Sequence, residues 1–214
     1  MKKINFILLL FISAAILTSC NKESVDKQST TKTNEKKDAL NQDKNNTSKE
    51  VTNSSSGNIN LFKVDKVEKS SGSKSAPNFF WTEKGSQVSL KDLKGKVILV
   101  NLWATWCGPC IREMPDLSKI SEELKDKNFK MLGINIFQQG KSKKVEDFLN
   151  SNPVSYTILD GNQEVVDAFS DADGKPIEAV PTTFIIDKSG KIAETIIGGR
   201  DKETFLKIIN KYLN

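Results

Sequence analysis

A near-continuous apolar run, Val97–Trp103, is followed closely by two cysteines, Cys107 and Cys110. The run reads VILVNLW and has the length of a strand. Its lack of polar alternation is typical of a central strand that is covered on both faces. Pro109 suits the first turn of a helix, because it has no N–H group that would go unbonded there. A buried strand that leads directly into a helix restricts the chain to folds in which strands and helices are interleaved.

The same alternation continues to the C-terminus. Further strands are predicted at 130–137, 156–159, 183–186 and 192–197, and helices at 109–127, 142–150, 163–169 and after Asp201, which can cap the last one. Residues 170–176, SDADGKP, indicate an exposed loop that approaches the side of the fold carrying Cys107 and Cys110. The pattern predicts an α/β fold with a central mixed sheet flanked by helices.

The spacing of Cys107 and Cys110 allows a disulfide to close within one helical turn. At a helix N-terminus, unpaired N–H groups and partial positive charge favour a thiolate at Cys107. Cys107, at the exposed end, is the expected attacking thiol, and Cys110, one turn inward, the expected resolving thiol. A zinc site and a structural disulfide are the alternatives. Zinc would need further Cys or His ligands, and the chain has no histidine and one other cysteine. We therefore expect no metal and no cofactor beyond the redox-active disulfide.

The N-terminus has the layout of a secretion signal. Two lysines at positions 2 and 3 precede an apolar run over 4–17. This run is shorter than the roughly 20 residues of a membrane span, but it suits a signal peptide. It ends in Leu-Thr-Ser-Cys at 17–20, which resembles the lipobox of bacterial lipoproteins. We expect a signal peptide over 1–19, and a plain signal peptide or an uncleaved anchor stays open as an alternative.

In that lipoprotein class, the cysteine after the cleavage site carries a diacylglycerol, so Cys20 is the predicted lipidation site. Its acyl chains would hold the protein on the extracytoplasmic side of the cell membrane. The assignment also leaves Cys107 and Cys110 as a pair, with no odd thiol in an oxidising compartment.

Residues 20–75 are rich in Lys, Ser, Thr and Asn and predict a disordered tether, with the folded domain at 76–214. A short apolar patch over 59–67 leaves open an additional strand. Residues 77–214 carry 19 basic and 19 acidic side chains, so the net charge of +5 comes from the first 76 residues. A neutral domain gives no support to nucleic-acid binding. The absence of histidine excludes Ser-His-Asp and Cys-His catalysis.

Three segments carry a family resemblance. They are WATWCGPC at 103–110 followed by Glu-Met-Pro at 113–115, APNFFWTEKGSQVSLKDLKGK at 76–96, and VPTTFIID at 180–187. Together they resemble the extracytoplasmic thioredoxin-like group typified by TlpA and ResA, over roughly 76–214. The resemblance implies a thioredoxin-like fold with an N-terminal strand extension and an added helix–strand unit within 138–179.

The resemblance also implies roles for individual residues. Pro181 should be cis and face the cysteines, and the Val180 backbone should pair with an extended substrate segment. Asn101 stands where thioredoxin has a buried aspartate. Glu113 matches a glutamate of the group and can lie near the sulfurs, with a solvated helix carboxylate as the alternative.

Around the cysteine pair, Trp106 is expected to shield the disulfide, and Gly108 and Pro109 form the dipeptide between the cysteines. The implied activity is reduction of protein disulfides by a membrane-anchored enzyme. Its partners would be a cysteine-containing extracytoplasmic protein and a membrane electron donor of the thioredoxin-reducing kind. One duty within the family is the reduction of apocytochrome c. A thiol peroxidase of the peroxiredoxin type and a non-catalytic surface-binding module remain the alternatives.

Overall fold

Eight strands form one mixed sheet in the computed structural model, which describes residues 59–214. The order across the sheet is β3-β2-β1-β6-β5-β4-β7-β8. β1 pairs with β6, β6 with β5, and β5 with β4 in parallel, and the other pairs are antiparallel. The strands are β1 (Leu61–Glu68), β2 (Asn78–Glu83), β3 (Ser86–Ser89), β4 (Val97–Trp103), β5 (Phe129–Asn135), β6 (Thr157–Asp160), β7 (Thr182–Ile186) and β8 (Ile192–Ile197).

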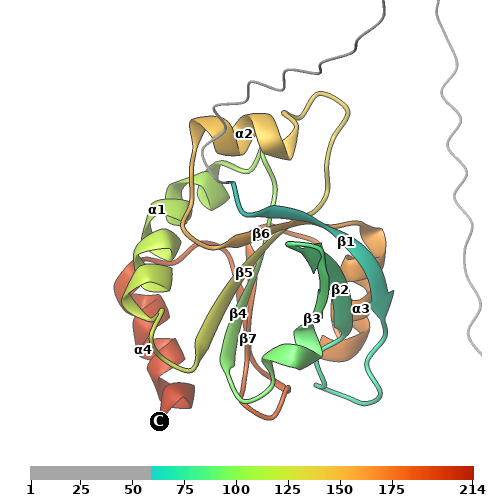
Figure 1. Cartoon of the computed structure of the whole chain (residues 1–214), viewed down its shortest axis with the longest axis vertical. Helices are drawn as coiled ribbons and strands as arrows, with labels where there is room; N and C mark the ends of the chain where they lie inside the picture. Colours follow the sequence, from blue (N-terminus) through green and yellow to red (C-terminus); the bar gives the residue numbers. More distant parts are fainter. Residues whose placement is uncertain (1–58) are drawn as a thin grey trace, which may run out of the picture. The chain divides into compact units, whose positions relative to one another are not determined.

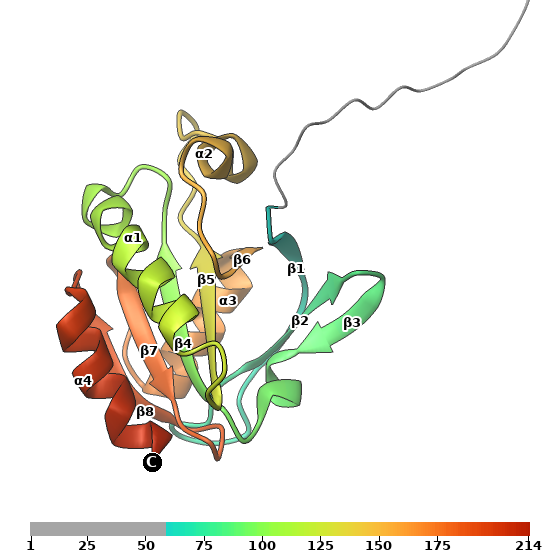
Figure 2. The same ribbon diagram turned by 60° about the vertical axis from the view of Figure 1, so that its left-hand side comes forward.

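Helices cover both faces of this sheet. α1 and α4 lie side by side on one face, while α3 lies on the other face (Figures 1 and 2). The helices are η1 (Leu90–Leu93), α1 (Gly108–Glu123), α2 (Val145–Ser151), α3 (Gln163–Asp173) and α4 (Lys202–Leu213). The predicted α/β class, with a mixed sheet between helices, is therefore confirmed.

β4 is the central strand that the apolar run predicted, and all seven of its residues are buried. Alternate side chains of a strand point to opposite faces of the sheet. Val97, Leu99 and Trp103 accordingly share a core with α1, α2 and α4. Ile98, Val100 and Leu102 pack instead in a second core with α3 and the β1–β3 segment. Asn101 belongs to the first series by register, so its polar side chain faces α1.

β1 corrects the predicted start of the folded domain. The composition of 20–75 predicts a tether, yet residues 61–68 form a strand between β2 and β6. Val64 is buried, and Leu61, Phe62 and Val67 are partly buried against the two cores. The patch is too short to fold alone, and it becomes stable because both of its edges are hydrogen-bonded. The signal peptide, Cys20 and residues 20–58 lie outside the described residues.

The expected exposed loop at 170–176 is also corrected. Its first four residues belong to α3, which ends at a left-handed Gly174. Asp173 is buried, forms an ion pair with Lys74, and accepts a 2.9 Å hydrogen bond from Thr195 Oγ1. The Lys74 N–H donates to Ala172 O at 2.8 Å. The β1–β2 connection therefore holds the C-terminal end of α3, a contact that no local pattern could indicate.

Candidate active site

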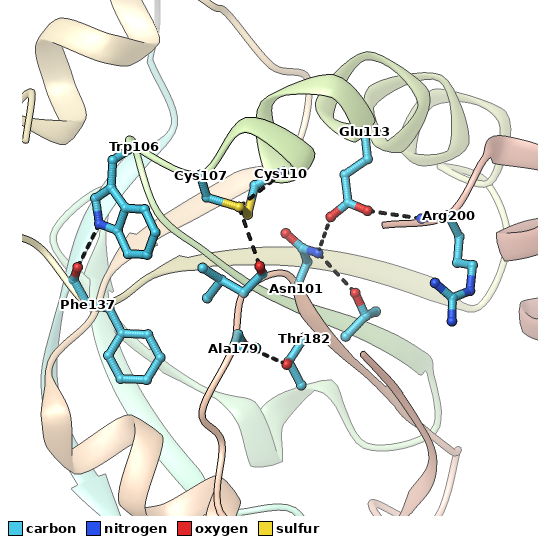
Figure 3. The surroundings of a disulfide bond; sticks show 11 residues. Asn101, Trp106, Cys107, Cys110, Glu113, Phe137, Ala179, Thr182 and Arg200 are labelled. Carbon is cyan, nitrogen blue, oxygen red and sulfur yellow. Dashed lines mark hydrogen bonds between the residues drawn. A yellow bond between two sulfur atoms is a disulfide. The ribbon is translucent and has the colours of Figure 1, made fainter. Parts of the chain in front are cut away.

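The turn between β4 and α1 places the two cysteines at the start of a helix. Cys107 is the N-cap residue of α1, and its Sγ accepts a 3.2 Å hydrogen bond from the Cys110 N–H. A disulfide joins the two residues (Figure 3). Cys107 is 3% exposed and Cys110 is fully buried. An N–H group directed at the Cys107 sulfur is the contact that stabilises a thiolate after reduction.

The segment before β7 faces the disulfide. The Val180–Pro181 peptide bond is cis, as the family resemblance implied. The Val180 carbonyl oxygen lies 3.6 Å from Cys107 Sγ (Figure 3). The Gly198 N–H donates to Pro181 O at 2.8 Å, which ties this turn to the end of β8. The main-chain carbonyl of Val180 thus faces the sulfur of Cys107, the expected attacking thiol.

Trp106 lies at the rim of the site. The residue is 43% exposed, and its Nε1–H donates to Phe137 O at 2.8 Å (Figure 3). Phe137 has a φ of 54°, a left-handed conformation that is uncommon for a bulky residue. Such outliers cluster at functional sites, where the surroundings hold them in place. Gly108 and Pro109 are exposed between the cysteines, whereas both cysteines are buried, so Cys107 is less exposed than its place at the end of the helix predicted.

Asn101 and Glu113 meet beneath the disulfide, between β4 and α1. Both are buried, with exposed fractions of 2% and 4%. The Asn101 Nδ2 group donates to Glu113 Oε1 at 2.8 Å and to Thr183 Oγ1 at 2.9 Å. The alternative of a solvated helix carboxylate at position 113 is therefore wrong. Helical spacing placed Glu113 one turn beyond Cys110, on the inward face of α1.

Burial raises the pKa of Glu113 from its ordinary value of 4.5 to about 7. Three weaker effects oppose this rise in pKa: the Asn101 hydrogen bond, the Arg200 N–H, which donates to Oε2 at 3.3 Å, and the Arg200 charge. The carboxyl group also lies against Gly199, where a Cβ atom would be 3.2 Å from Oε2. Glu113 therefore exchanges a proton near neutral pH, the range in which a general acid or base works best.

The structure brings the sequence-predicted residues of the folded domain into one site. They are Asn101, Trp106, Cys107, Gly108, Pro109, Cys110, Glu113, Val180 and Pro181, and Cys20 lies outside the described residues. Sequence reasoning missed Thr183, Phe137 and Arg200. The one available signal for Arg200 was the Gly-Gly pair at 198–199 after the last strand. Glycine lets the backbone there come close to another group, in this case the Glu113 carboxyl group.

Two further observations concern residues 59–214. No cluster of His, Cys, Asp and Glu side chains in this part of the chain could hold a metal ion. None of the helices described in the same range is long and apolar enough to cross a membrane.

Comparison with known proteins places the site in a family. Residues 70–212 match the family described as Redoxin. The thiol-disulfide oxidoreductase ResA of Bacillus thuringiensis (strain Al Hakam) is 35% identical over 144 residues, covering 66% of this chain and 78% of that protein. ResA of Bacillus subtilis (strain 168) is 32% identical over 142 residues, covering 65% and 72%.

A solved structure supports the same placement. The thiol:disulfide interchange protein of Chlorobium tepidum TLS, a thioredoxin family protein, is 31% identical and has a TM-score of 0.58. The similarity covers 68% of this chain and 99% of that one. The chain therefore belongs to the Redoxin family and is a thiol-disulfide oxidoreductase of the ResA type, with a Cys107–Cys110 pair.

Proposed function

We propose that the protein is a membrane-anchored, extracytoplasmic reductase of protein disulfides. The observation that carries the thiol chemistry is the geometry at Cys107, while the anchor is proposed from the Leu-Thr-Ser-Cys segment at 17–20. The Cys107 sulfur accepts an N–H bond at the start of α1 and lies beside the Val180 carbonyl next to a cis proline. The first contact favours a nucleophilic thiolate. The second offers main-chain polar groups to an extended substrate segment, and such pairing gives affinity without requiring one sequence.

The reaction starts from the reduced pair. The Cys107 thiolate attacks one sulfur of the substrate disulfide, so a mixed disulfide forms and the other substrate sulfur leaves as a thiolate. Cys110 then loses its proton and attacks the Cys107 sulfur. The Cys107–Cys110 disulfide forms, and the second substrate sulfur leaves. Two electrons pass to the substrate, and its two thiolates take up two protons.

Glu113 supplies a proton site for this sequence. The buried Cys110 cannot release its proton directly to bulk water, and Glu113 lies one helical turn away on the same face of α1. A carboxyl group with a pKa of about 7 can accept a proton from a thiol and return it near neutral pH. Asn101 positions the carboxyl group through the 2.8 Å hydrogen bond to Oε1.

The oxidised pair must be reduced again before the next turnover. We assign this step to a membrane electron donor of the thioredoxin-reducing kind, which a lipid anchor at Cys20 would keep close by. The substrate is a protein with a pair of cysteines on the same side of the membrane. Apocytochrome c before haem attachment is one member of that class.

The test combines activity with trapping. The purified protein should reduce the disulfides of insulin, and Cys107→Ser should have no activity. Cys110→Ser should stall as a mixed disulfide, because its Cys107 still attacks and nothing resolves the product. Normal turnover by Cys110→Ser would refute these roles. Consumption of peroxide in place of insulin reduction would assign a thiol peroxidase.

The direction of electron flow has its own measurement, the reduction potential of the Cys107–Cys110 pair against glutathione. A value near that of thioredoxin, about −270 mV, would support a reductase. A value near that of the strong oxidant DsbA, about −120 mV, would instead assign an oxidase of thiols.

A further inference from the structure

An open pocket of about 390 Å³ lies beside the disulfide, at the junction of α1 with the β8–α4 loop. It is lined by Pro109, Arg112, Glu113, Asp116, Arg200 and Asp201, among others. The Arg112 guanidinium lies against the residue that follows the attacking cysteine, since a Cβ atom at Gly108 would stand 3.4 Å from Arg112 Nη1. The pocket therefore begins at the point where a substrate chain bound at Cys107 would extend away from the cysteine pair.

The choice of basic residue is unusual for this chain. Only two of its 32 basic residues are arginines, and both line this pocket. Arginine differs from lysine in its planar fork of N–H donors, which binds a carboxylate through two parallel hydrogen bonds. Lysine would be enough for a general positive surface. The placement of both arginines at this pocket therefore points to a ligand that is recognised by its planar shape as well as by its charge.

Neither guanidinium forms an ion pair with a carboxylate of residues 59–214. Arg200 Nη1 donates instead to the carbonyl oxygens of Gly198 and Gly199, at 3.1 Å and 2.8 Å, which fixes the direction of its side chain. Arg112 is exposed at the pocket wall. Both guanidinium groups therefore have donors to offer to a ligand.

The acidic groups of the pocket are each held by another partner. Asp116 pairs with Lys119 at 3.0 Å, and Asp201 caps α4 by accepting from the Thr204 N–H at 2.8 Å. Glu113 accepts from Asn101 Nδ2 through Oε1 and from the main-chain N–H of Arg200 through Oε2, so it does not pair with either guanidinium. The acids that share the pocket thus leave the two arginines without an internal carboxylate partner.

We propose that this pocket binds a carboxylate of the protein substrate, the side chain of an aspartate or glutamate close in sequence to the target cysteine. The inference rests on the proposed function and adds a determinant of substrate choice to it. Arg112 is the principal contact, because its guanidinium lies nearest the cysteine pair. Arg200 closes the other side of the pocket from the β8–α4 loop.

The test uses two disulfide-bonded peptides that differ only in having Glu or Gln next to the cysteines. The rate constant for reduction by the reduced protein is divided by the rate constant for dithiothreitol, which removes the intrinsic effect of the charge on the disulfide. The corrected rate should favour the Glu peptide by about twofold to fivefold, the range of one exposed ion pair.

Arg112→Gln should abolish this preference, and Arg112→Lys should keep part of it because the charge remains without the fork. Arg200→Lys is a second variant, which removes the guanidinium group from the β8–α4 loop and keeps the positive charge there. Lys143→Gln is the matched control. It removes an exposed charge from the loop on the other side of the disulfide, where Lys143 O accepts from Thr105 Oγ1, and it should keep the preference. Equal corrected rates in the wild type, or a preference that survives Arg112→Gln, would overturn the inference.

A second readout separates this inference from the proposed function. If neither peptide is reduced, the proposed function fails, and the pocket is judged by alkylation of Cys107. The ratio of the rates with iodoacetate and iodoacetamide should fall in Arg112→Gln by more than it falls in Lys143→Gln. An equal ratio in both variants would refute the carboxylate site.

Discussion

Replacing Glu113 with Gln should change how the stability of the oxidised protein depends on pH. In the folded protein burial raises the pKa of Glu113 to about 7, against 4.5 for an ordinary glutamate. Between these values the folded state holds a proton that the unfolded state has released, so the free energy of unfolding falls as pH rises. At about 1.4 kcal/mol per pH unit, the full loss is about 3 kcal/mol. This loss of unfolding free energy is complete only at pH values above the pKa of Glu113 in the folded protein.

A glutamine in place of Glu113 cannot titrate, so the variant should lose this dependence. The unfolding free energy of Glu113→Gln minus that of the wild type should rise by about 3 kcal/mol between about pH 4.5 and about pH 8.5. Urea unfolding of both oxidised proteins at several pH values measures the difference. Glu122→Gln is the matched control, because Glu122 is exposed on the same helix and should show no such rise. A Glu113→Gln difference that stays constant with pH would refute the buried, proton-holding carboxyl group.

The same substitution should affect the thiols. An ionised Glu113 disfavours a second negative charge on a nearby sulfur, and the coupling is reciprocal. In Glu113→Gln, the pH profile of Cys107 alkylation should move to lower pH by about half a unit or more, equivalent to about 0.7 kcal/mol. An alkylation curve that superimposes on the wild type would mean that Glu113 does not act on the attacking thiol.

Two further predictions concern other parts of the chain. Cys20→Ala should abolish labelling by fatty acid and block cleavage before that residue, and normal processing with membrane retention would contradict the lipid anchor. Asp173→Ala should lower the unfolding free energy by roughly 1–3 kcal/mol, because it removes the buried partner of Lys74. Asp171→Ala breaks only the exposed pair with Lys69, so it should lower the unfolding free energy by under about 1 kcal/mol. Urea unfolding measures both variants. Equal losses in Asp173→Ala and Asp171→Ala would contradict the greater importance of the buried pair.

The sequence was most informative where one local signal determined the outcome. The apolar run of β4 needs burial on both sides, and the bounds of that strand match the predicted run. Asp201 caps α4 as its position before the periodic apolar residues indicated. At Cys107 the N-cap position follows from Pro109 in the first helical turn. In each case the cause lies within a few residues of the effect.

The sequence was least informative where a segment depends on distant partners. β1 has a mixed polar and apolar pattern, and it is a strand only because β2 and β6 bond to its two edges. The burial of Asp173 depends on Lys74, which lies far earlier in the chain. Arg200 reaches Glu113 through a main-chain N–H, a group that every residue except proline carries. Such contacts leave no pattern in the residues themselves.

The register of α1 explains why one helix can serve two purposes. Successive helical residues are rotated by about 100°, so Arg112 is exposed while its neighbour Glu113 is buried, and Glu113 reaches the pocket only at its floor. Cys110, Glu113 and Leu117 lie on the buried face, which carries the carboxyl group that we propose as the proton site. Pro109, Arg112 and Asp116 lie on the open face and line the pocket beside the disulfide.

This separation has a measurable consequence. The charge that opposes the raised pKa of Glu113 comes from Arg200 and not from Arg112. Arg112→Gln should therefore alter the preference between Glu and Gln peptides while leaving in place the pH dependence of the unfolding free energy that Glu113 produces. Glu113→Gln should remove that pH dependence while leaving the preference between the Glu and Gln peptides in place. A substitution on one face that changed both properties equally would show that the proton site and the substrate pocket act as a single unit.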